Sequence, residues 1–265
     1  MYSPLQLTLK YLQYYYTASN GKGHGVHSPF VFEFITKVLN DKRHFYAYDK
    51  IEDLRNDLLL DKRVLTINDF GAGSTVSKSN ERKVKDIVRS ALKPKKFGQL
   101  MFRMVDFYHL NTIVELGTSL GITTSYLASG NALGKVYTFE GAGEVAQIAI
   151  ENFQYLELNN IELIEGNFDE KLPNQLEHIE TIDLAFVDGN HRKQPTIHYF
   201  EQLLKKADKN SIFIFDDIHW SEEMEEAWKY IQQHSSVTLT IDLFFIGIVF
   251  FRNEQKVQQH FSIRF

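Results

Sequence analysis

From residue 112 onward, short β-rich runs alternate with helical patterns, and this alternation is the feature that most limits the fold. The helical patterns between the runs span residues 121–129, 144–158, 195–207 and 221–234. The strand-like runs are TIVEL (112–116), KVYTFE (135–140), IELIE (161–165), TIDLAFVD (181–188), SIFIFDD (211–217), VTLTIDL (237–243) and FFIGIVFFR (244–252). Continuous apolar strands alternating with helices predict an α/β domain, with a parallel sheet covered on both faces. The last two runs have no helix between them, which predicts an antiparallel hairpin at one sheet edge.

The region before residue 112 has a different pattern. Residues 4–16, 28–40 and 82–92 show amphipathic helical spacing, with a polar and charged section between them. Residues 93–97, KPKKF, form the expected junction, because Pro94 interrupts a helix and the lysines favour water. We therefore predict a mostly helical N-terminal cap over residues 1–92 and a main domain over residues 93–265.

Composition limits the environment and the partners. The chain has 265 residues, of which 43% are apolar and 24% charged, enough to bury a core and stay soluble. A net charge of -5 provides no broad basic field, which disfavours nucleic acid as a partner. The absence of cysteine excludes disulfides and thiolate sites and fits a reducing cytoplasm. Neither a signal peptide nor a run of roughly 18 apolar residues is present, so no membrane association is expected.

Two glycine-rich turns compete for a nucleotide ligand, INDFGAGST at 67–75 and IVELGTSLG at 113–121. A nucleotide-binding turn needs a strand before it, a helix after it and an acid at the end of the next strand. The second turn meets all three conditions, because Glu140 closes the next strand-like run 23 positions after Gly117. A carboxylate there can accept both hydroxyls of a ribose.

The first turn fails these conditions. The segment after it, residues 76–96, contains no second β run and no acid at a strand end. We interpret residues 69–74 as a tight turn that needs positive φ at a glycine, with a lid loop over the active site as the functional alternative.

The favoured turn has the pattern E-x-G-x-x-x-G. Thr118 follows Gly117, and Ser119 stands where a dinucleotide-binding turn carries its second glycine. That glycine lets the backbone approach a pyrophosphate, so its replacement disfavours NAD.

Four segments together, residues 115–121, Glu140, VDGNH (187–191) and FDDIHW (215–220), resemble a class I S-adenosylmethionine (SAM) dependent methyltransferase. The likeness is to the small-molecule O-methyltransferases that include catechol and macrolide-sugar methyltransferases, and it covers about residues 97–252. It implies a Rossmann-like, doubly wound, seven-stranded and mainly parallel sheet of order 3-2-1-4-5-7-6, whose last strand is reversed.

The resemblance also implies the residues around the cofactor. Those lining its methionine part would be Glu115, Gly117, Thr118 and Ser119, with Gly121 at the start of the helix. Glu140 would bind the ribose, and Gly166, Asn167 and Phe168 would surround the adenine. Asn167 stands where many relatives have an aspartate, and Phe168 is equally consistent with a core position.

Three aspartates follow two strands that are neighbours in the implied order. Asp188 ends one run, and Asp216 and Asp217 end the next. Ligands of open α/β sheets lie at this edge, so these carboxylates should converge. In the metal-dependent relatives the matching trio holds magnesium, and crowded carboxylates would otherwise repel one another. The structural alternative is that Asp216 or Asp217 caps the next helix.

Two histidines lie in loops at the same edge. His191 and His219 are both candidate general bases, because imidazole titrates near neutral pH. His191 is the first choice, since it matches the position of a basic lysine in catechol-type relatives, and Asp188 is the other candidate proton acceptor.

The sequence therefore predicts SAM-dependent methylation of a small-molecule hydroxyl with assistance from a divalent metal, Mg²⁺. The alternatives are a metal-free methyltransferase acting on RNA or protein, an NAD-dependent oxidoreductase and a non-catalytic nucleoside-binding domain. The aromatic segment YLQYYY (11–16) favours core packing, with a homodimer contact or a substrate wall as alternatives.

Overall fold

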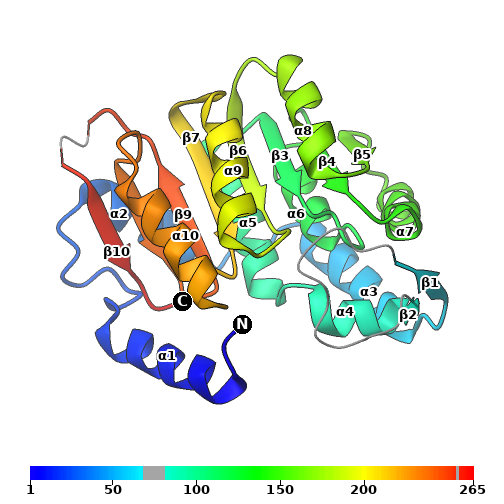
Figure 1. Cartoon of the computed structure of the whole chain (residues 1–265), viewed down its shortest axis with the longest axis horizontal. Helices are drawn as coiled ribbons and strands as arrows, with labels where there is room; N and C mark the ends of the chain where they lie inside the picture. Colours follow the sequence, from blue (N-terminus) through cyan, green and yellow to red (C-terminus); the bar gives the residue numbers. More distant parts are fainter. Residues whose placement is uncertain (68–80, 255–256) are drawn as a thin grey trace. The chain divides into compact units, whose positions relative to one another are not determined.

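The computed structural model describes residues 1–67, 81–254 and 257–265 (Figure 1). Two compact units are present. The terminal unit comprises Met1–Asp41 and Ile179–Phe265, and the central unit comprises Lys42–His178. Each unit contains several parallel strands and the helices that connect them.

The central unit holds three parallel strands in the order β3-β4-β5, which confirms the expected order 3-2-1 of the first three strands. Each strand is followed by a helix. The elements are β3 (Thr112–Leu116), α6 (Ile122–Gly130), β4 (Lys135–Glu140), α7 (Gly143–Tyr155), β5 (Ile161–Glu165) and α8 (Phe168–Glu177).

Strand β3 shows why these runs are continuously apolar. Val114 and Leu116 are fully buried, and so is Glu115 between them. Successive side chains of a strand point to opposite faces of the sheet, so both faces of β3 are covered. The alternation seen in the sequence thus reflects a sheet with helices on both sides.

The terminal unit continues the predicted order. Its strands lie in the order β6-β7-β9-β8-β10, with β9 antiparallel to both β7 and β8. This confirms the order 4-5-7-6 and the hairpin at its end. The two helices of this unit that follow β6 and β7 lie side by side in Figure 1. The elements are β6 (Ile182–Val187), α9 (Lys193–Leu204), β7 (Ala207–Asp216), α10 (Glu222–Gln233), β8 (Leu239–Asp242), β9 (Ile246–Phe250) and β10 (Gln259–Ser262).

Strand β10 corrects the predicted number of seven strands. It pairs in parallel with β8 and extends the sheet edge. Its sequence, QHFS, has no run of apolar residues, because an edge strand with partly exposed side chains needs none. The Rossmann-like fold class is confirmed, and within the described residues its main sheet has one strand more than expected.

Helices dominate the first hundred residues, as expected. Ser3 caps α1 (Pro4–Thr17), and Ser28 caps α2 (Pro29–Glu33), which continues as the π-helix η1 (Phe34–Leu39). The central unit contains α3 (Ala47–Leu60), α4 (Val84–Ala91) and α5 (Lys95–Tyr108). Helices α3, α5 and α8 were missed. These N-terminal helices divide between the two units, and a functional boundary at residue 92 stays a prediction.

Pro94 interrupts the helical region as predicted, since α4 ends at Ala91 and α5 begins directly after Pro94. Both helices belong to the central unit. The segment is therefore a short helix connection within one unit.

A short antiparallel pair corrects the statement that no β run follows the first glycine turn. Strand β1 (Val64–Thr66) pairs with β2 (Glu81–Lys83). The sequence of β2, ERK, is charged and shows no apolar alternation, so it gave no strand signal, and the buried side chain of the pair is Leu65 on β1. The glycine turn itself, Asp69 to Ser74, lies outside the described residues.

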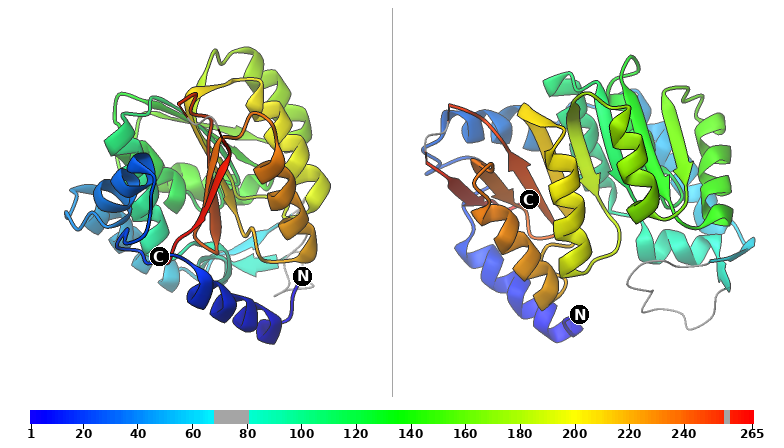
Figure 2. Two further views of the ribbon diagram at one scale, coloured as in Figure 1. Left: turned by 90° about the vertical axis from the view of Figure 1, so that its left-hand side faces the viewer. Right: turned by 45° about the horizontal axis from the view of Figure 1, so that its top comes forward.

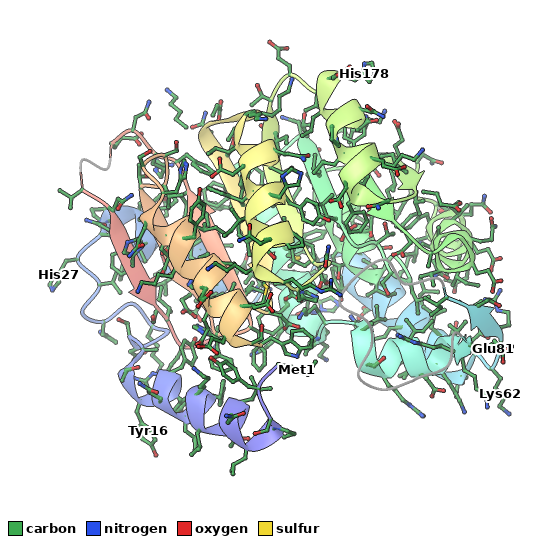
Figure 3. All side chains as sticks on the ribbon, in the orientation of Figure 1. Met1, Tyr16, His27, Lys62, Glu81 and His178 are labelled. Atoms are coloured by element: carbon green, nitrogen blue, oxygen red, sulfur yellow. The ribbon has the colours of Figure 1, made fainter. Side chains whose placement is uncertain are left out.

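Helix α1 lies beside the C-terminal end of the chain, as Figure 2 shows. The Tyr14 hydroxyl donates to the carbonyl of Ile263, and Tyr14 is buried. Tyr16 projects from the helix (Figure 3) and is 81% exposed. The aromatic segment is therefore core only in part, because one tyrosine packs inward while its neighbours face outward. Within the described ranges, no helix combines the length and apolar character that a membrane crossing requires.

Candidate active site

The turn between β3 and α6 has an unusual backbone. Gly117, Ser119 and Gly121 all have positive φ, at 106°, 49° and 78°. The N–H groups of Gly117 and Thr118 both donate to the carbonyl of Phe139, at 3.0 and 3.1 Å. The turn is thus fastened to the carboxyl end of β4, the edge at which sheets of this kind bind ligands.

Replacement of Gly121 by alanine is expected to destabilise the chain by more than about 2 kcal/mol, because left-handed backbone costs an L-residue about 1–2 kcal/mol before packing is counted. An added Cβ would lie 2.4 Å from the Phe153 ring. Denaturant unfolding measures the loss. Gly25→Ala is the matched control, since Gly25 has φ of 82° and a Cβ added there would meet no atom within 4 Å. Equal losses for the two variants would contradict the packing argument.

Glu140 is tied to this turn. Its Oε2 accepts a hydrogen bond from the N–H of Ser119 at 2.8 Å, and its Oε1 accepts one from the N–H of Ala142 at 2.9 Å. The carboxylate is therefore oriented by two backbone donors on different segments. This is the arrangement expected for an acid that holds a ribose beside a glycine turn.

Glu115, which precedes the turn, and Thr118, which is part of it, are both buried, with exposures of 0% and 2%. Oε2 of Glu115 accepts hydrogen bonds from the hydroxyls of Thr124 and Thr138, at 2.5 and 2.6 Å. The Thr118 and Thr138 hydroxyl oxygens are 2.6 Å apart. Both side chains thus face the interior, whereas the resemblance implied a place along the cofactor.

Burial raises the pKa of the Glu115 carboxyl to about 7, against the two threonine hydrogen bonds, which lower it. The charge of Glu140 adds to the increase. The sequence analysis missed Thr124 and Thr138. The strand register offered a signal for one of them, because Thr138 lies directly opposite Glu115 on β4.

The three residues expected at the adenine follow β5. Gly166 has φ of 131°, and its N–H donates to the Glu140 carbonyl at 2.9 Å. Asn167 caps α8 by accepting from the N–H of Asp169 at 3.0 Å, which gives this asparagine a structural role. Phe168 is partly buried, and its ring lies 6.5 Å from that of Phe139.

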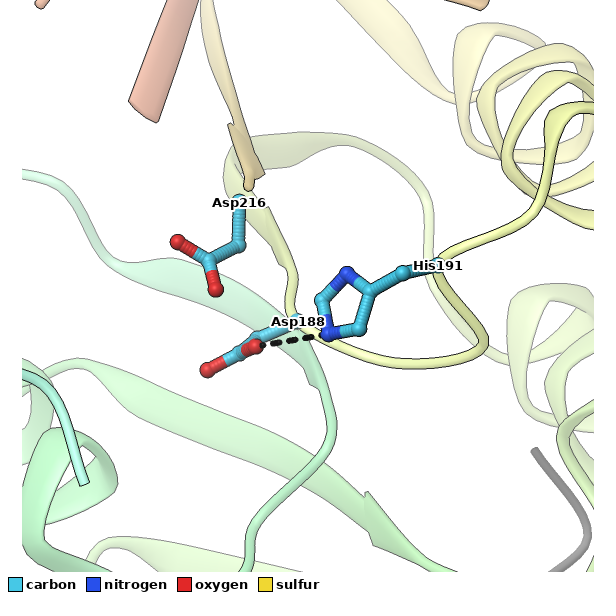
Figure 4. Close-up of side chains that lie close together, drawn as sticks. All are labelled: Asp188, His191 and Asp216. Carbon is cyan, nitrogen blue, oxygen red and sulfur yellow. Dashed lines mark ion pairs between the residues drawn. The ribbon is translucent and has the colours of Figure 1, made fainter. Parts of the chain in front are cut away.

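A cluster of two carboxylates and an imidazole lies at the ends of β6 and β7 (Figure 4). Asp188 follows β6, Asp216 ends β7, and His191 lies in the loop after β6. One potential ligand atom from each lies within 4.8 Å of the others. Nε2 of His191 is 3.5 Å from Oδ1 of Asp188. Asp216 is almost completely buried, at 1% exposure.

This cluster differs from the expected trio by one residue. His191 takes part, and Asp217 does not. Adjacent residues at a strand end point in different directions, and the Asp217 backbone has φ of 53° and donates its N–H to the Phe245 carbonyl. Ser221 caps α10, so neither aspartate has the capping role that was the structural alternative.

His219, the second candidate base, lies between two acids. Its Nδ1 is 3.1 Å from Oε1 of Glu225, and its Nε2 is 2.7 Å from Oδ2 of Asp242. Burial lowers the pKa of His219, but the two carboxylates outweigh burial and raise it. An imidazolium with both nitrogens engaged has no lone pair for a proton, so the environment favours a structural role.

Replacement of His219 by alanine is expected to cost about 2–4 kcal/mol of stability near pH 6, because two partly buried carboxylates lose their shared partner. The folded pKa lies above the unfolded value, so this contribution is complete below about pH 6.5 and is lost as pH rises through the folded pKa. Unfolding of wild type and variant near pH 6 and pH 9 measures the difference. The exposed His24→Ala is the control, and a pH-independent loss would refute the ion-pair argument.

Comparison with known proteins places these features in a family context. Residues 114–218 match a family model described as a methyltransferase domain. No curated protein matches the sequence significantly.

Solved structures with a similar fold are those of methyltransferases. An O-methyltransferase from Bacillus cereus in complex with SAH is 20% identical, with 83% of this chain and 97% of that chain covered at a TM-score of 0.55. The O-methyltransferase TomG from Streptomyces achromogenes, in complex with SAM, is 14% identical, with 80% of this chain and 92% of that chain covered at a TM-score of 0.56. The SAH-bound methyltransferase PaMTH1 from Podospora anserina is 13% identical, with 85% of this chain and 97% of that chain covered at a TM-score of 0.57. These likenesses concern the fold, and with the family model they support the resemblance to a methyltransferase found in the sequence.

Proposed function

We propose that this chain, whose residues 114–218 match a methyltransferase domain, is a class I SAM-dependent methyltransferase that transfers the methyl group to a hydroxyl of a small molecule. The observation that carries the proposal is the Glu140 carboxylate, which accepts from the turn N–H of Ser119 at the end of β4. The O-methyltransferases among the similar structures support the choice of an oxygen acceptor.

Glu140 can hold the turn and a nucleoside together. Each carboxylate oxygen accepts more than one hydrogen bond, so Glu140 can accept from the backbone of Ser119 and Ala142 and from ribose hydroxyls together. Gly117 and Ser119, both with positive φ, present backbone to the same ligand. Bound SAM would supply a methyl group on a sulfonium, which an oxygen nucleophile attacks in line.

The acid cluster fits a divalent cation. Two carboxylates and an imidazole with ligand atoms within 4.8 Å supply oxygen and nitrogen donors, and Asp216 is buried. Such crowding is relieved by a cation or by protons. Asp188, His191 and Asp216 would hold the ion, which would make an acceptor hydroxyl easier to deprotonate. A mixed donor set suits Mn²⁺ as well as Mg²⁺.

A metal-free variant of this mechanism has its own support. The 3.5 Å contact between His191 and Asp188 resembles a base with its orienting carboxylate. In this variant His191 takes the hydroxyl proton, and Asp188 stabilises the resulting imidazolium. The two variants differ in whether added cation changes turnover.

Calorimetric titration with SAH and with NAD, each with and without Mg²⁺ or Mn²⁺, tests the proposal. We expect SAH to bind and Glu140→Ala to weaken its binding by about 1–3 kcal/mol, the cost of unpaired polar partners. Glu162→Ala is the control, because this β5 acid pairs with Lys135 at the surface.

Binding of NAD without binding of SAH would overturn the assignment. If Glu140→Ala binds SAH as tightly as wild type does, the ribose is held by another residue. Indifference of both binding and turnover to either cation would leave the His191 and Asp188 pair as the base.

A further inference from the structure

We infer that Glu115 is a positioning residue for the glycine turn at residues 117–121 and acts on it through the hydroxyls of Thr138 and Thr118. The inference rests on the proposed function, because the turn is taken as the cofactor cradle. It differs from the role implied by the resemblance, in which Glu115 itself lines the cofactor.

Three elements meet at this carboxylate. Glu115 lies on β3, Thr138 lies opposite it on β4, and Thr124 lies in the first turn of α6. Oε2 of Glu115 accepts from Thr138 at 2.6 Å and from Thr124 at 2.5 Å. One buried oxygen thus joins the two strands and the helix that frame the turn.

The carboxylate also sets the direction of the hydroxyl chain. A carboxylate is an acceptor, so the Thr138 hydroxyl donates a hydrogen bond to Glu115. Thr138 then offers a lone pair to the Thr118 hydroxyl, 2.6 Å away, which must be the donor of that bond. Thr118 is the second residue of the turn, so this row of hydroxyl hydrogen bonds holds the turn against β4. The backbone hydrogen bond from Thr118 to Phe139 acts in the same direction.

Burial separates Glu115 from any ligand. The side chain is 0% exposed, and Oε1 accepts no hydrogen bond from the described residues. A buried carboxylate with one oxygen unsatisfied is costly, whereas a leucine or glutamine at this position would be cheaper. Retaining such a group where the chain turns is consistent with a role in geometry.

Thr124 provides a matched control for Thr138. Both residues donate a hydroxyl of the same kind to the same oxygen, and both are fully buried. Thr138 continues to the turn through Thr118, while the Thr124 bond continues to α6. Valine is nearly isosteric with threonine and removes the hydroxyl in each case.

The test is SAH affinity by calorimetry for the full chain and its variants. We expect Thr138→Val to weaken SAH binding by about tenfold, the equivalent of one lost hydrogen bond. Thr124→Val should stay within about threefold of wild type, because the chain to the turn is intact. Thr138→Ser should restore the affinity. Thermal melting of each variant reports whether it is folded, and Thr118→Val breaks the same chain from the turn side if Thr138→Val does not fold.

A pH series adds a readout that a general loss of packing would not change. The wild-type affinity should decline as pH falls through about 7, where burial places the pKa of Glu115. Thr138→Val should lack this decline. Glu140, the other carboxylate whose charge acts on Glu115, is the same in both proteins. Equal losses for the valine variants at positions 124 and 138 would overturn the inference, and absence of SAH binding by the wild type would overturn the proposed function as well.

Discussion

When Glu115 is replaced by glutamine, the free energy of unfolding of the variant relative to that of wild type is expected to rise by about 3 kcal/mol between about pH 5 and about pH 8.5. Burial raises the pKa of this carboxyl from 4.5 to about 7. Between these values the folded chain holds a proton that the unfolded chain has released, so wild-type stability falls as pH rises. Glutamine is neutral throughout and is free of this loss.

Denaturant unfolding at several pH values gives the difference in the free energy of unfolding between the two proteins. Comparing differences cancels the fixed cost of placing an amide beside Thr124 and Thr138. Glu162→Gln is the surface control, and its difference from wild type should not change with pH in the same way. A flat difference for Glu115→Gln would mean that the carboxyl titrates normally and that its burial is relieved by hydration.

Replacement of Asp188 by asparagine is expected to lower kcat by about 10²- to 10⁴-fold, the range that general acid–base catalysis supplies. Asp188 belongs to both mechanisms, since it is a ligand in the metal cluster and the partner of His191 at 3.5 Å. Removing its charge therefore impairs either one. Single-turnover measurements with saturating SAM isolate the chemical step.

The variant Asp217→Asn tests whether the metal site is the three-aspartate trio predicted from the sequence or the cluster that contains His191. Asp217 lies next to Asp216 but outside the group of converging ligand atoms. We expect this variant to keep kcat within about threefold of wild type, as is usual for a residue that does not act on the reacting atoms. A loss as large as that of Asp188→Asn would favour the three-aspartate site.

His191→Asn distinguishes the two mechanisms on the same assay. If the imidazole is the base, kcat falls and added Mn²⁺ does not restore it. If the imidazole is a metal ligand, high Mn²⁺ restores part of the activity, because the two aspartates remain.

Local patterns in the sequence predicted much of the fold. The strand order within each unit was implied by the family resemblance. The alternation of apolar runs and amphipathic helices predicted the parallel sheet and the antiparallel hairpin of β8 and β9. These features follow from short-range periodicity, which the chain displays directly. Strand β10 and helices α3, α5 and α8 were missed, because edge exposure and mixed polarity weaken that signal.

The sites divide in the same way. The strand, glycine turn and following acid set the places of Gly117, Gly121 and Glu140 along the chain, so spacing alone predicted that Glu140 lies beside the turn. The sequence also predicted that Asp188 and Asp216 converge at the ends of neighbouring strands, as they do in the structure.

The sequence by itself thus determined the fold class, the position of the glycine turn proposed to hold the cofactor and the edge at which acids gather, since each depends on residue type and order. Tertiary structure alone decided that His191 replaces Asp217 in the cluster, that His219 is enclosed by Glu225 and Asp242, and that Glu115 is buried. These outcomes depend on side-chain direction and on partners distant along the chain, such as Asp242, which lies 23 residues from His219, and packing fixes both.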